Sequence, residues 1–595
     1  MSIETGDIIS RIYGGFRGAD FRGEEINLVR SPDCLNVWKD YKHTDSIRTR
    51  PAMELKQSFS DTVYGIFFYD GVMIVHSGTK LYKVANGVKT EIFSGVKEAE
   101  SNAFIYENIW YFKDGKHYIQ YDGKTVSNVV GYIPTTSIGR GAQSGGSTYQ
   151  YVNILSDYRI NAFRGDGEDV DIENDEGEVT GTEWKGSTEF WLDVKEIDSD
   201  YKPVITLTKL VNNEVIEEPI TDFTVDYKNG KITFKKAPPA PYTDGQDNIT
   251  VKFKKVVRIK DKQGNLTGYY RDLILNCTML QVFDNRVFFS GNPNYPNKVW
   301  YCGLDDPSYC ADDDWVSEGM DEAQIKGMVA GNDALWVFRE PSESNTNIFY
   351  HRPTTDDEYG KVYPSSHSSI TMGCVGKAIN FNDDIIFFSE RGMEGISGDI
   401  TTEQVAAHRS SLVDRKMISE PKYTNMLLEE WEGYLLIFIG DKVYLADSRT
   451  AFTNENHIEY EFFYWQLEKP ATSVKVYNGI LYIGTEDGVY TLTDHTSNVE
   501  SYWTTPIDKF KVPHKLKTTN KRGCVVEATG DISVYAKIED TDFELIGTYE
   551  NVTDYFVSRI KRKKFKDIQL KFHSNTRFSL ETATLECFIG GYIKR

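Results

Sequence analysis

The chain has 595 residues, of which 40% are hydrophobic and 13% are aromatic, including 37 Tyr and 32 Phe. This length exceeds one ordinary domain, and the aromatic excess suits half-buried strands better than helix bundles, so we expect several units that are mostly β. The formal net charge of −22 excludes a protein whose whole surface grips nucleic acid.

The cysteines and the start of the chain indicate a protein made in a cytosol. Seven cysteines are scattered without a C-x-x-C pair, which predicts reduced, buried thiols. The start, MSIETGDIISRIYGG, lacks the basic and then apolar pattern of a signal peptide. Since no apolar run approaches the roughly 18 residues of a membrane helix, we predict no membrane span.

Residues 1–46 precede the first clear strand pattern. They include the glycine-rich stretch GGFRGADFRG (14–23), which follows no predicted strand and opens no helix, so it does not indicate a phosphate site. Glycines lack a Cβ atom and let one backbone approach another closely. We therefore predict an extended N-terminal arm over residues 1–46.

One sequence pattern then recurs seven times: two runs rich in β-branched and aromatic residues, separated by a pair of turn-forming residues. Successive turn pairs are about 37, 177, 48, 50, 49 and 46 residues apart. Five of these gaps match the ~40–50 residues of a four-stranded propeller blade. We predict an all-β fold with a β-propeller of six or seven blades over 47–144 and 273–500; a hairpin stack or β-sandwich array is the alternative. The turn pairs are Asp70-Gly71, Glu107-Asn108, Asp284-Asn285, Asn332-Asp333, Asp383-Asp384, Glu432-Gly433 and Asn478-Gly479.

The long gap predicts an inserted domain over residues 145–272. Its stretch DFTVDYKNGKITFKKAPP (222–239) indicates a hairpin that turns at Asn229-Gly230. We expect a β-sandwich-like domain. The acidic run DGEDVDIENDEGE (166–178) does not fit an EF-hand and is interpreted as a solvated loop.

Two further segments complete the chain. The best helix candidate is TTEQVAAHRSSLVDRK (401–416), which begins with residues that can cap a helix. From residue 501 to 595, strands such as DIQLKFH (567–573) alternate apolar with polar residues. This alternation predicts a C-terminal β-sandwich-like domain with one dry face and one wet face.

Motifs for catalysis or metal binding are missing from the sequence. It contains no G-x-S-x-G, H-E-x-x-H or P-loop pattern, and its ten histidines lack metal-ligand spacing. The abundant carboxylates include no recognisable pair of acid and nucleophile for glycan cleavage. We therefore expect a protein that is not an enzyme and that binds no cofactor or metal.

The segment RIKRKKFKD (559–567) is the one concentrated basic stretch. Residues 501–595 carry about +5, whereas the remainder carries about −27. Such a cluster predicts contact with DNA phosphates or with an acidic neighbouring subunit, and both contacts are salt-sensitive. The alternative is that these side chains form the solvent-facing side of strands. The candidate residues are Arg559, Lys561, Arg562, Lys563, Lys564 and Lys566.

Both ends of the chain resemble a known family. The pattern GGFRGADFRGEEINLVRSPDCLNVWKDYKHTDSIRTRPAMEL (14–55) resembles the opening of tailed-phage β-propeller proteins. The ending RIKRKKFKDIQLKFHSN…FIGGYIKR (559–595) is similar to the C-terminal domain of phage packaged-DNA stabilisation, head-completion or tail nozzle proteins. With the propeller between them, the resemblance covers most of the chain, but the insertion departs from it.

The resemblance implies a virion structural protein made in the bacterial cytoplasm and located in the phage tail. It implies a homo-oligomeric ring, a hexamer, below the portal and adaptor, which retains packaged DNA and forms the channel for its ejection. A net-acidic lumen would touch double-stranded DNA only transiently, because it repels phosphate. The alternative hypothesis is a tail protein that recognises host-surface glycan through the insertion or through aromatic-rich segments such as EYEFFYWQ (459–466).

Overall fold

The computed structural model describes residues 8–23, 26–42, 46–133, 135–139, 153–260, 263–357, 360–397, 404–454, 457–494, 498–561 and 564–592. The protein is all-β, with many four-stranded antiparallel sheets consistent with propeller blades. It divides into two compact units, residues 1–101 with 318–595, and residues 102–317. The helices in the described ranges are short: α1 (Tyr270–Leu275), α2 (Asp414–Met417) and the 3-10 turn η1 (Tyr423–Asn425).

Five four-stranded antiparallel sheets form most of the first unit. In order of their first blade-like hairpin they comprise β6 (Val63–Tyr69), β7 (Val72–Ser77), β8 (Lys80–Ala85) and β9 (Val88–Ser94); β30 (Ile325–Gly331), β31 (Ala334–Arg339), β32 (Ile348–His351) and β35 (Ser365–His367); β36 (Ala378–Phe381), β37 (Asp384–Ser389), β38 (Gly392–Ser397) and β39 (Val405–His408); β40 (Leu427–Trp431), β41 (Tyr434–Ile439), β42 (Lys442–Asn454) and β43 (His457–Gln466); β44 (Ser473–Tyr477), β45 (Ile480–Gly484), β46 (Gly488–Thr493) and β5 (Ala52–Ser58). A small side ribbon joins β33 (Thr354–Asp356) to β34 (Gly360–Val362).

The second unit contains two more sheets of the same kind and the insertion. The two sheets comprise β10 (Asn102–Tyr106), β11 (Ile109–Lys113), β12 (Tyr118–Tyr121) and β13 (Val126–Asn128); β26 (Met279–Phe283), β27 (Arg286–Ser290), β28 (Lys298–Tyr301) and β29 (Trp315–Ser317). They share a core that includes Tyr111, Tyr118 and Phe289. The seven predicted hairpins are thus confirmed, one at the start of each four-stranded sheet.

All seven hairpins turn in the same conformation. Both central residues have positive φ, for example 48° and 73° at Asp70 and Gly71, and 49° and 77° at Asn478 and Gly479. This is the type I′ turn, whose twist matches that of the flanking strands. One prediction was displaced by a residue, because the turn lies at Asn382-Asp383 and Asp384 already belongs to a strand.

The sheets of the first unit pack face to face through buried and partly buried aromatic and aliphatic side chains. Phe338 of β31 and Phe387 of β37 stack with ring centroids 5.3 Å apart. Phe68 of β6 and Tyr477 of β44 stack at 4.0 Å. Because a single four-stranded sheet cannot cover both of its own faces, this contact with neighbouring sheets is what buries them.

Strand β5 links the beginning of this series of sheets to its end. It pairs antiparallel with β46, so residues 52–58 complete a sheet whose other strands lie at 473–493. Residues that follow β5 form the next sheet, β6 to β9. The first strand of the blade region therefore supplies the last strand of its final sheet.

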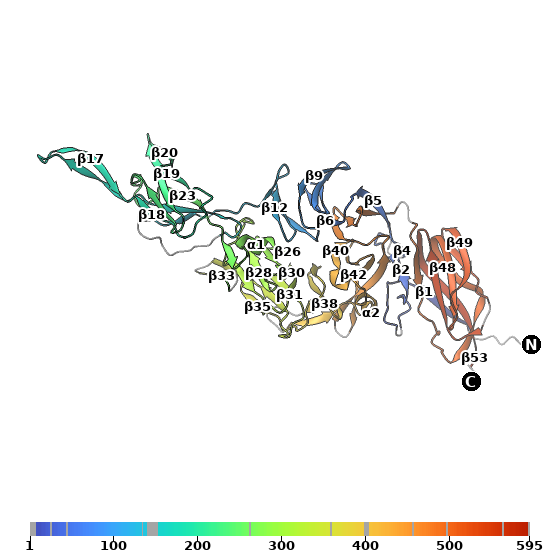
Figure 1. Ribbon diagram of the computed structural model, residues 1–595. Helices are drawn as coiled ribbons and strands as arrows, with labels where there is room; N and C mark the ends of the chain where they lie inside the picture. The colour runs from blue at the N-terminus through green and yellow to red at the C-terminus, as the bar shows by residue number, and fades with distance from the viewer. Residues whose placement is uncertain are drawn as a thin grey trace, which may run out of the picture. The chain divides into compact units, whose positions relative to one another are not determined.

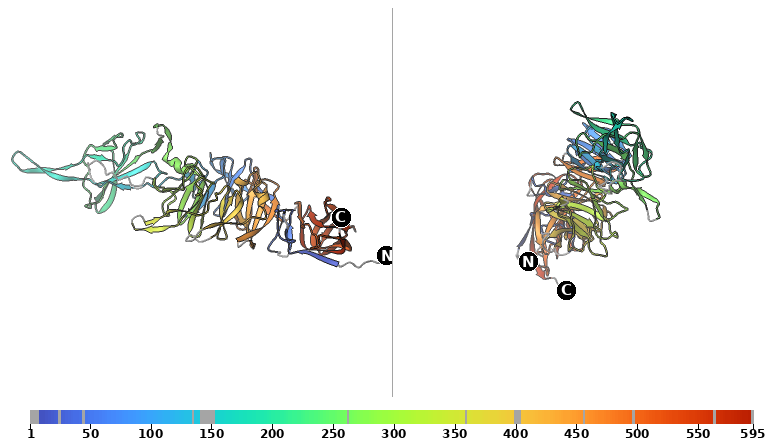
Figure 2. Two further views of the ribbon diagram at one scale, coloured as in Figure 1. Left: turned by 90° about the horizontal axis from the view of Figure 1, so that it is seen from below. Right: turned by 90° about the vertical axis from the view of Figure 1, so that its left-hand side faces the viewer.

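Eleven strands form one further sheet, which we call the terminal sheet. It joins β1 to β4 near the N-terminus to β47 to β53 near the C-terminus, and β1 lies beside β53 in Figures 1 and 2. Three short strands of the predicted arm, β1 to β3, therefore belong to the same sheet as the C-terminal strands. The strands are β1 (Ile8–Gly14), β2 (Cys34–Leu35), β3 (Val37–Trp38), β4 (Ile47–Thr49), β47 (Ser501–Thr504), β48 (Lys515–Ile538), β49 (Glu544–Val552), β50 (Tyr555–Ser558), β51 (Lys564–Phe565), β52 (Ile568–Ser574) and β53 (Phe578–Tyr592).

The N-terminal segment also packs closely against β43. The backbone N–H of Ala19 donates to the Phe462 carbonyl at 2.6 Å. A Cβ atom on Gly18 would lie 1.6 Å from that same carbonyl oxygen, so only glycine fits there. This agrees with the role predicted for the glycine-rich stretch.

The insertion has its own core between a five-stranded and a three-stranded sheet, with buried Phe163, Phe190, Ile205, Ile232 and Val251. A two-stranded hairpin, labelled at β17 in Figure 1, extends from this body. The strands are β14 (Thr135–Ser137), β15 (Tyr158–Phe163), β23 (Ile249–Lys254), β19 (Val204–Val211) and β20 (Glu214–Ile220); β18 (Glu189–Trp191), β22 (Lys231–Phe234) and β21 (Phe223–Asp226); β16 (Gly167–Glu173) and β17 (Val179–Gly186); β24 (Arg258–Lys260) and β25 (Leu266–Tyr269).

Three local predictions need correction. The helix over 401–416 is wrong: residues 405–408 form β39, paired with β38, and α2 begins only at Asp414, while 401–403 lie outside the described residues. The Asn229-Gly230 hairpin exists, but its loop has four residues, and the N–H of Gly230 donates to the Asp226 carbonyl at 2.9 Å. Much of the acidic run 166–178 is strand β16 rather than loop.

Candidate functional site

The basic segment lies in the terminal sheet, between β50 and β52. Arg559 follows β50 directly, and Lys564 begins the short strand β51, which pairs with β48. Buried Ile560 and Phe565 hold the segment to the domain, because their side chains point inward between exposed neighbours. Arg562 and Lys563 lie outside the described residues.

The basic side chains that the structure describes are exposed. Arg559, Lys561, Lys564 and Lys566 all face solvent, and none of the four forms an ion pair with another described residue. The positions are held by backbone contacts instead: Lys517 Nζ donates to the Lys566 carbonyl at 2.6 Å. Both the partner-contact interpretation and the solvent-facing interpretation remain compatible with this exposure.

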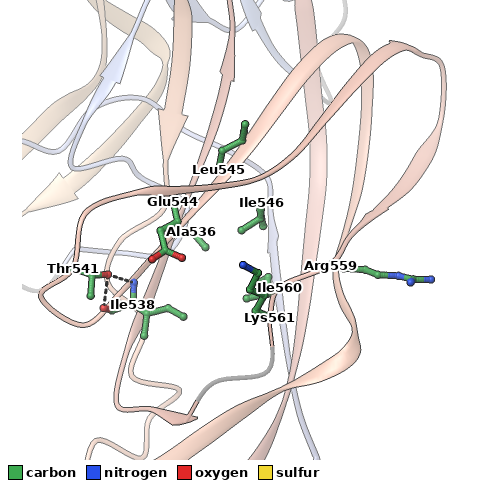
Figure 3. Close-up of a pocket in the computed structure, with 9 residues that line it drawn as sticks. All are labelled: Ala536, Ile538, Thr541, Glu544, Leu545, Ile546, Arg559, Ile560 and Lys561. Carbon is green, nitrogen blue, oxygen red and sulfur yellow. Dashed lines mark hydrogen bonds between the residues drawn. The ribbon is translucent and has the colours of Figure 1, made fainter.

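Two of the basic residues border a pocket of about 110 Å³ (Figure 3). In Figure 3 the side chain of Lys561 points into the pocket, whereas Arg559 extends away from it. Glu544, which also lines the pocket, is drawn on the side toward which Lys561 points. The apolar lining comes from the end of β48, the start of β49 and the basic segment itself: Ala536, Ile538, Leu545, Ile546 and Ile560.

The wet face of the terminal sheet joins the basic segment to exposed apolar side chains. Strand register places Ile8, Phe588, Thr518 and Lys564 in one row across four strands. Residues directly opposite in neighbouring strands lie on the same face. Ile8 is 60% exposed. Sequence reasoning missed this row, because its members are brought together only by pairing between distant parts of the chain.

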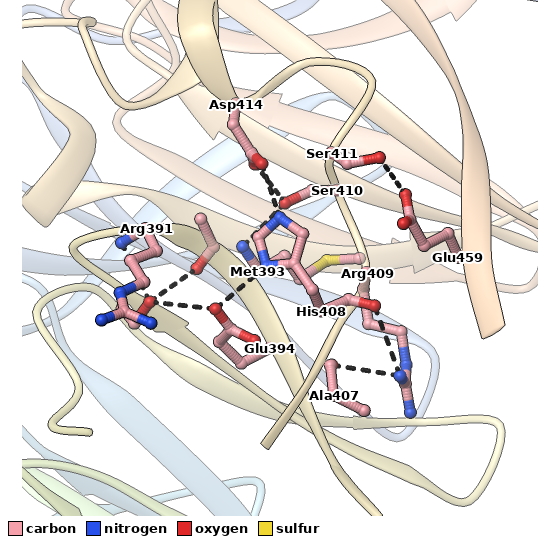
Figure 4. A network of polar contacts seen from close by, with 12 residues as sticks. Arg391, Met393, Glu394, Ala407, His408, Arg409, Ser410, Ser411, Asp414 and Glu459 are labelled. Atoms are coloured by element: carbon pink, nitrogen blue, oxygen red, sulfur yellow. Dashed lines mark hydrogen bonds and ion pairs between the residues drawn. The ribbon is translucent and has the colours of Figure 1, made fainter. Parts of the chain in front are cut away.

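A separate polar network lies at the edge of the sheet β36 to β39 (Figure 4). His408 Nδ1–H donates to Glu394 Oε1 at 3.0 Å and Nε2–H donates to Asp414 Oδ2 at 2.5 Å. Burial alone would lower the pKa of this imidazole, but the two carboxylates outweigh it and raise the pKa to about 10. A histidine held protonated is a poor general base at neutral pH, so the network acts as a cross-link between β38, β39 and α2.

A larger pocket of about 610 Å³ lies at the base of the β16–β17 hairpin in the insertion. Carboxylates and cations line it together, among them Arg164, Asp166, Glu168 and Lys185. Tyr242, which is 44% exposed, lies in the chain between two lining residues. Such mixed hydrogen-bonding groups can bind a ligand rich in hydroxyls.

The described ranges show no group of three or more His, Cys, Asp or Glu side chains arranged to hold a metal ion. All seven cysteines are free and buried, as predicted. In the part of the chain that the structure describes, no helix is long and apolar enough to cross a membrane.

Comparisons with known proteins return only distant likenesses. No protein-family model matches the chain, and no curated protein sequence matches it. The computationally designed Ika8 protein is similar over 73% of this chain and 96% of its own, with a TM-score of 0.32 and 10% identity. BamB from Moraxella catarrhalis is similar over 78% of this chain and 94% of its own, with a TM-score of 0.33 and 10% identity. These scores are too low to carry an argument, so the description of the fold rests on the strand pairing given above.

Proposed function

We propose that the chain is a structural subunit of a tailed-phage virion, a ring-forming tail nozzle or head-completion protein. One observation supports this most: the two segments that resemble that family, at 14–55 and 559–595, both contribute strands to the same terminal sheet. The two regions of resemblance thus meet in one folded sheet, which supports interpreting them together. The ring, a hexamer in this proposal, attaches below the portal and adaptor and surrounds the DNA exit channel.

The proposal includes a seven-bladed propeller. Seven four-stranded sheets occur in the described residues, and each starts with a type I′ hairpin. The pairing of β5 with β46 supports closure, because it joins the start of the blade series to its end. Closure of this kind leaves few exposed strand edges on a long β protein.

The experiment that tests the proposal counts copies in particles. Quantitative mass spectrometry of the purified virion should find this chain at the copy number of the proposed hexameric ring. Its absence, or its presence at one or two copies, would refute the nozzle assignment. Native mass spectrometry of the purified chain should show a ring-sized oligomer in the presence of the adaptor.

The pocket in the insertion favours one second candidate, recognition of host-surface glycan. Its carboxylates and cations suit sugar hydroxyls. Tyr242 follows the lining residue Pro241 in the chain and is 44% exposed, so we choose it as the candidate ring for stacking on a sugar. A glycan array tests this candidate function. Binding by the full chain that is lost in Tyr242→Ala and retained in Tyr132→Ala would support glycan recognition. No binding to any glycan, or equal binding by both variants, would reject it.

A further inference from the structure

The pocket of Figure 3 combines aliphatic side chains with positive charge, and the polar side chains of Thr541 and Glu544 also line it. Ile538, Leu545 and Ile560 supply aliphatic surface from three separate segments. Leu545 is 56% exposed although it borders this surface. Arg559 and Lys561 stand beside it without an ion-pair partner among the described residues.

The size of the pocket restricts what can fill it. Its volume is about 110 Å³. An engineered protein cavity of about 150 Å³ accommodates benzene. The pocket therefore has room for one aliphatic side chain, and is too small for a drug-sized ligand or a sugar chain.

We propose that this pocket binds one aliphatic side chain of an acidic segment in a partner protein, with carboxylates beside that side chain paired to Arg559 and Lys561. Burial of the aliphatic group supplies affinity, because its surface leaves water. The charges orient the segment and exclude basic or neutral sequences. The inference deepens the proposed function by stating the chemistry of the partner that docks on the basic segment.

The aliphatic part of the lining favours a protein partner over DNA. Phosphate contacts need only exposed cations, and they gain nothing from aliphatic surface. Under the DNA interpretation, all exposed basic residues of the segment are equivalent. Under the pocket interpretation, Arg559 and Lys561 differ from Lys564 and Lys566, because only the first pair borders the pocket.

This difference gives a matched pair of variants in the full chain. Arg559→Ala with Lys561→Ala removes two charges at the pocket, and Lys564→Ala with Lys566→Ala removes two charges from the same segment away from it. All four positions are exposed, so both variants should fold, which thermal unfolding checks. The probe is a fluorescein-labelled peptide, GEDLDEG, measured by fluorescence anisotropy at low salt, with GEDGDEG as the peptide that lacks the aliphatic side chain.

We expect GEDLDEG to bind the unmodified chain and to lose about tenfold in affinity in the pocket variant. The matched variant should lose less than about threefold, through long-range charge alone. GEDGDEG should bind about tenfold more weakly than GEDLDEG. No binding of GEDLDEG, equal binding of the two peptides, or equal losses in the two variants would each overturn the proposal.

Two further outcomes identify other occupants. Duplex DNA could displace the peptide, and its own binding could fall equally in both variants. That result would show that the segment contacts phosphates. Sedimentation in which the chain alone associates and the pocket variant does not would place a second copy in the pocket; either result overturns the proposal as stated. Peptide binding does not depend on virion location, so this test can fail while the copy-number test succeeds, or the reverse.

Discussion

The blade-like sheets and the terminal sheet are both antiparallel, yet they are built from different ranges of sequence. In the hairpin that opens each blade-like sheet, paired strands follow one another and are joined by a two-residue turn. In the terminal sheet, Ile8 pairs with Phe588 and Cys34 with Trp503. Local hairpins obtain their register from the turn, whereas distant strands need another source of register.

In and around the terminal sheet, buried polar contacts fix the register of strands that are distant in sequence. Asp508 receives hydrogen bonds from Arg11 Nε at 2.6 Å and from the Tyr13 hydroxyl at 2.9 Å. Arg50, only 2% exposed, donates to Asn36 Oδ1 at 2.9 Å and to the Gln466 carbonyl at 2.7 Å. Because a slip by one residue would leave these groups unpaired, such contacts select one register.

The largest effect should come from Trp503→Ala, which we expect to destabilise the fold by about 3–5 kcal/mol. Trp503 is fully buried, and its ring meets Phe16 at 4.6 Å and donates Nε1–H to the Arg17 carbonyl. Denaturant unfolding measures the loss. Limited proteolysis should also cut the N-terminal segment faster.

The matched control is Trp336→Ala in the sheet β30 to β35, where the side chain is also buried. We expect a similar loss of stability without faster cleavage of the N-terminal segment. If both variants release that segment equally, the terminal sheet is not a separate module and the comparison fails.

Asp508→Asn should cost about 1.5–3 kcal/mol, because it removes the charge that pairs with Arg11 while keeping the size of the side chain. Chemical denaturation at neutral pH measures it. Asp494→Asn serves as the control, since its ion pair with Arg577 is about half exposed and should contribute less than about 1 kcal/mol. Equal effects at the two positions would argue against buried polar contacts as the source of register.

The sequence predicts the local hairpins well but does not predict the pairing of distant strands. The seven hairpins were predictable because turn chemistry and alternation act over a few residues, and the one displaced turn arose where Asn382, Asp383 and Asp384 are all turn-forming. Pairing of β1 with β53 was not predictable, since alternation along a strand does not name its partner. The helix prediction over 401–416 failed because pairing of β39 with β38 overrode local propensity.

The candidate site shows the same limit. Exposure of Lys561 and Lys564 followed from their place in a run of cations. The pocket did not, because Ile538, Leu545 and Ile560 lie in three segments that only the folded domain brings together. Composition can therefore indicate a charged surface, but not which aliphatic side chains the fold places beside it.

His408 sharpens the comparison, since it makes a partly buried polar contact within a blade-like sheet. Its folded pKa of about 10 lies above the ordinary value near 6.5, so protonation stabilises the fold. The contribution is complete below pH 6.5 and is lost as the pH rises toward 10. We expect a loss of about 1–2 kcal/mol, less than the full shift implies, because a third of the side chain meets solvent.

Denaturant unfolding between pH 6 and 10 measures this loss, with His408→Gln as the control that lacks the titrating group. The stability of the control should change less over that range. Parallel curves for the two proteins would show that the imidazole is not held protonated by Glu394 and Asp414.

The smallest effect should come from the turns themselves. Glu432 occupies a φ of 51°, which asparagine tolerates better than glutamate, and Glu432→Asn recreates the Asn-Gly pair of residues 478 and 479. We expect a gain of up to about 1 kcal/mol, because the left-handed conformation costs an ordinary residue roughly 1–2 kcal/mol and costs asparagine less. The reverse change, Asn478→Glu, should cost a similar amount. The ion pair of Glu432 with Lys42 spans 3.8 Å between exposed groups, so its loss should matter little. Equal and opposite shifts in the denaturation midpoint would establish that the turn residues set local hairpin stability. A loss of stability in both variants would mean instead that each turn depends on contacts with its own surroundings, as strand register does in the terminal sheet.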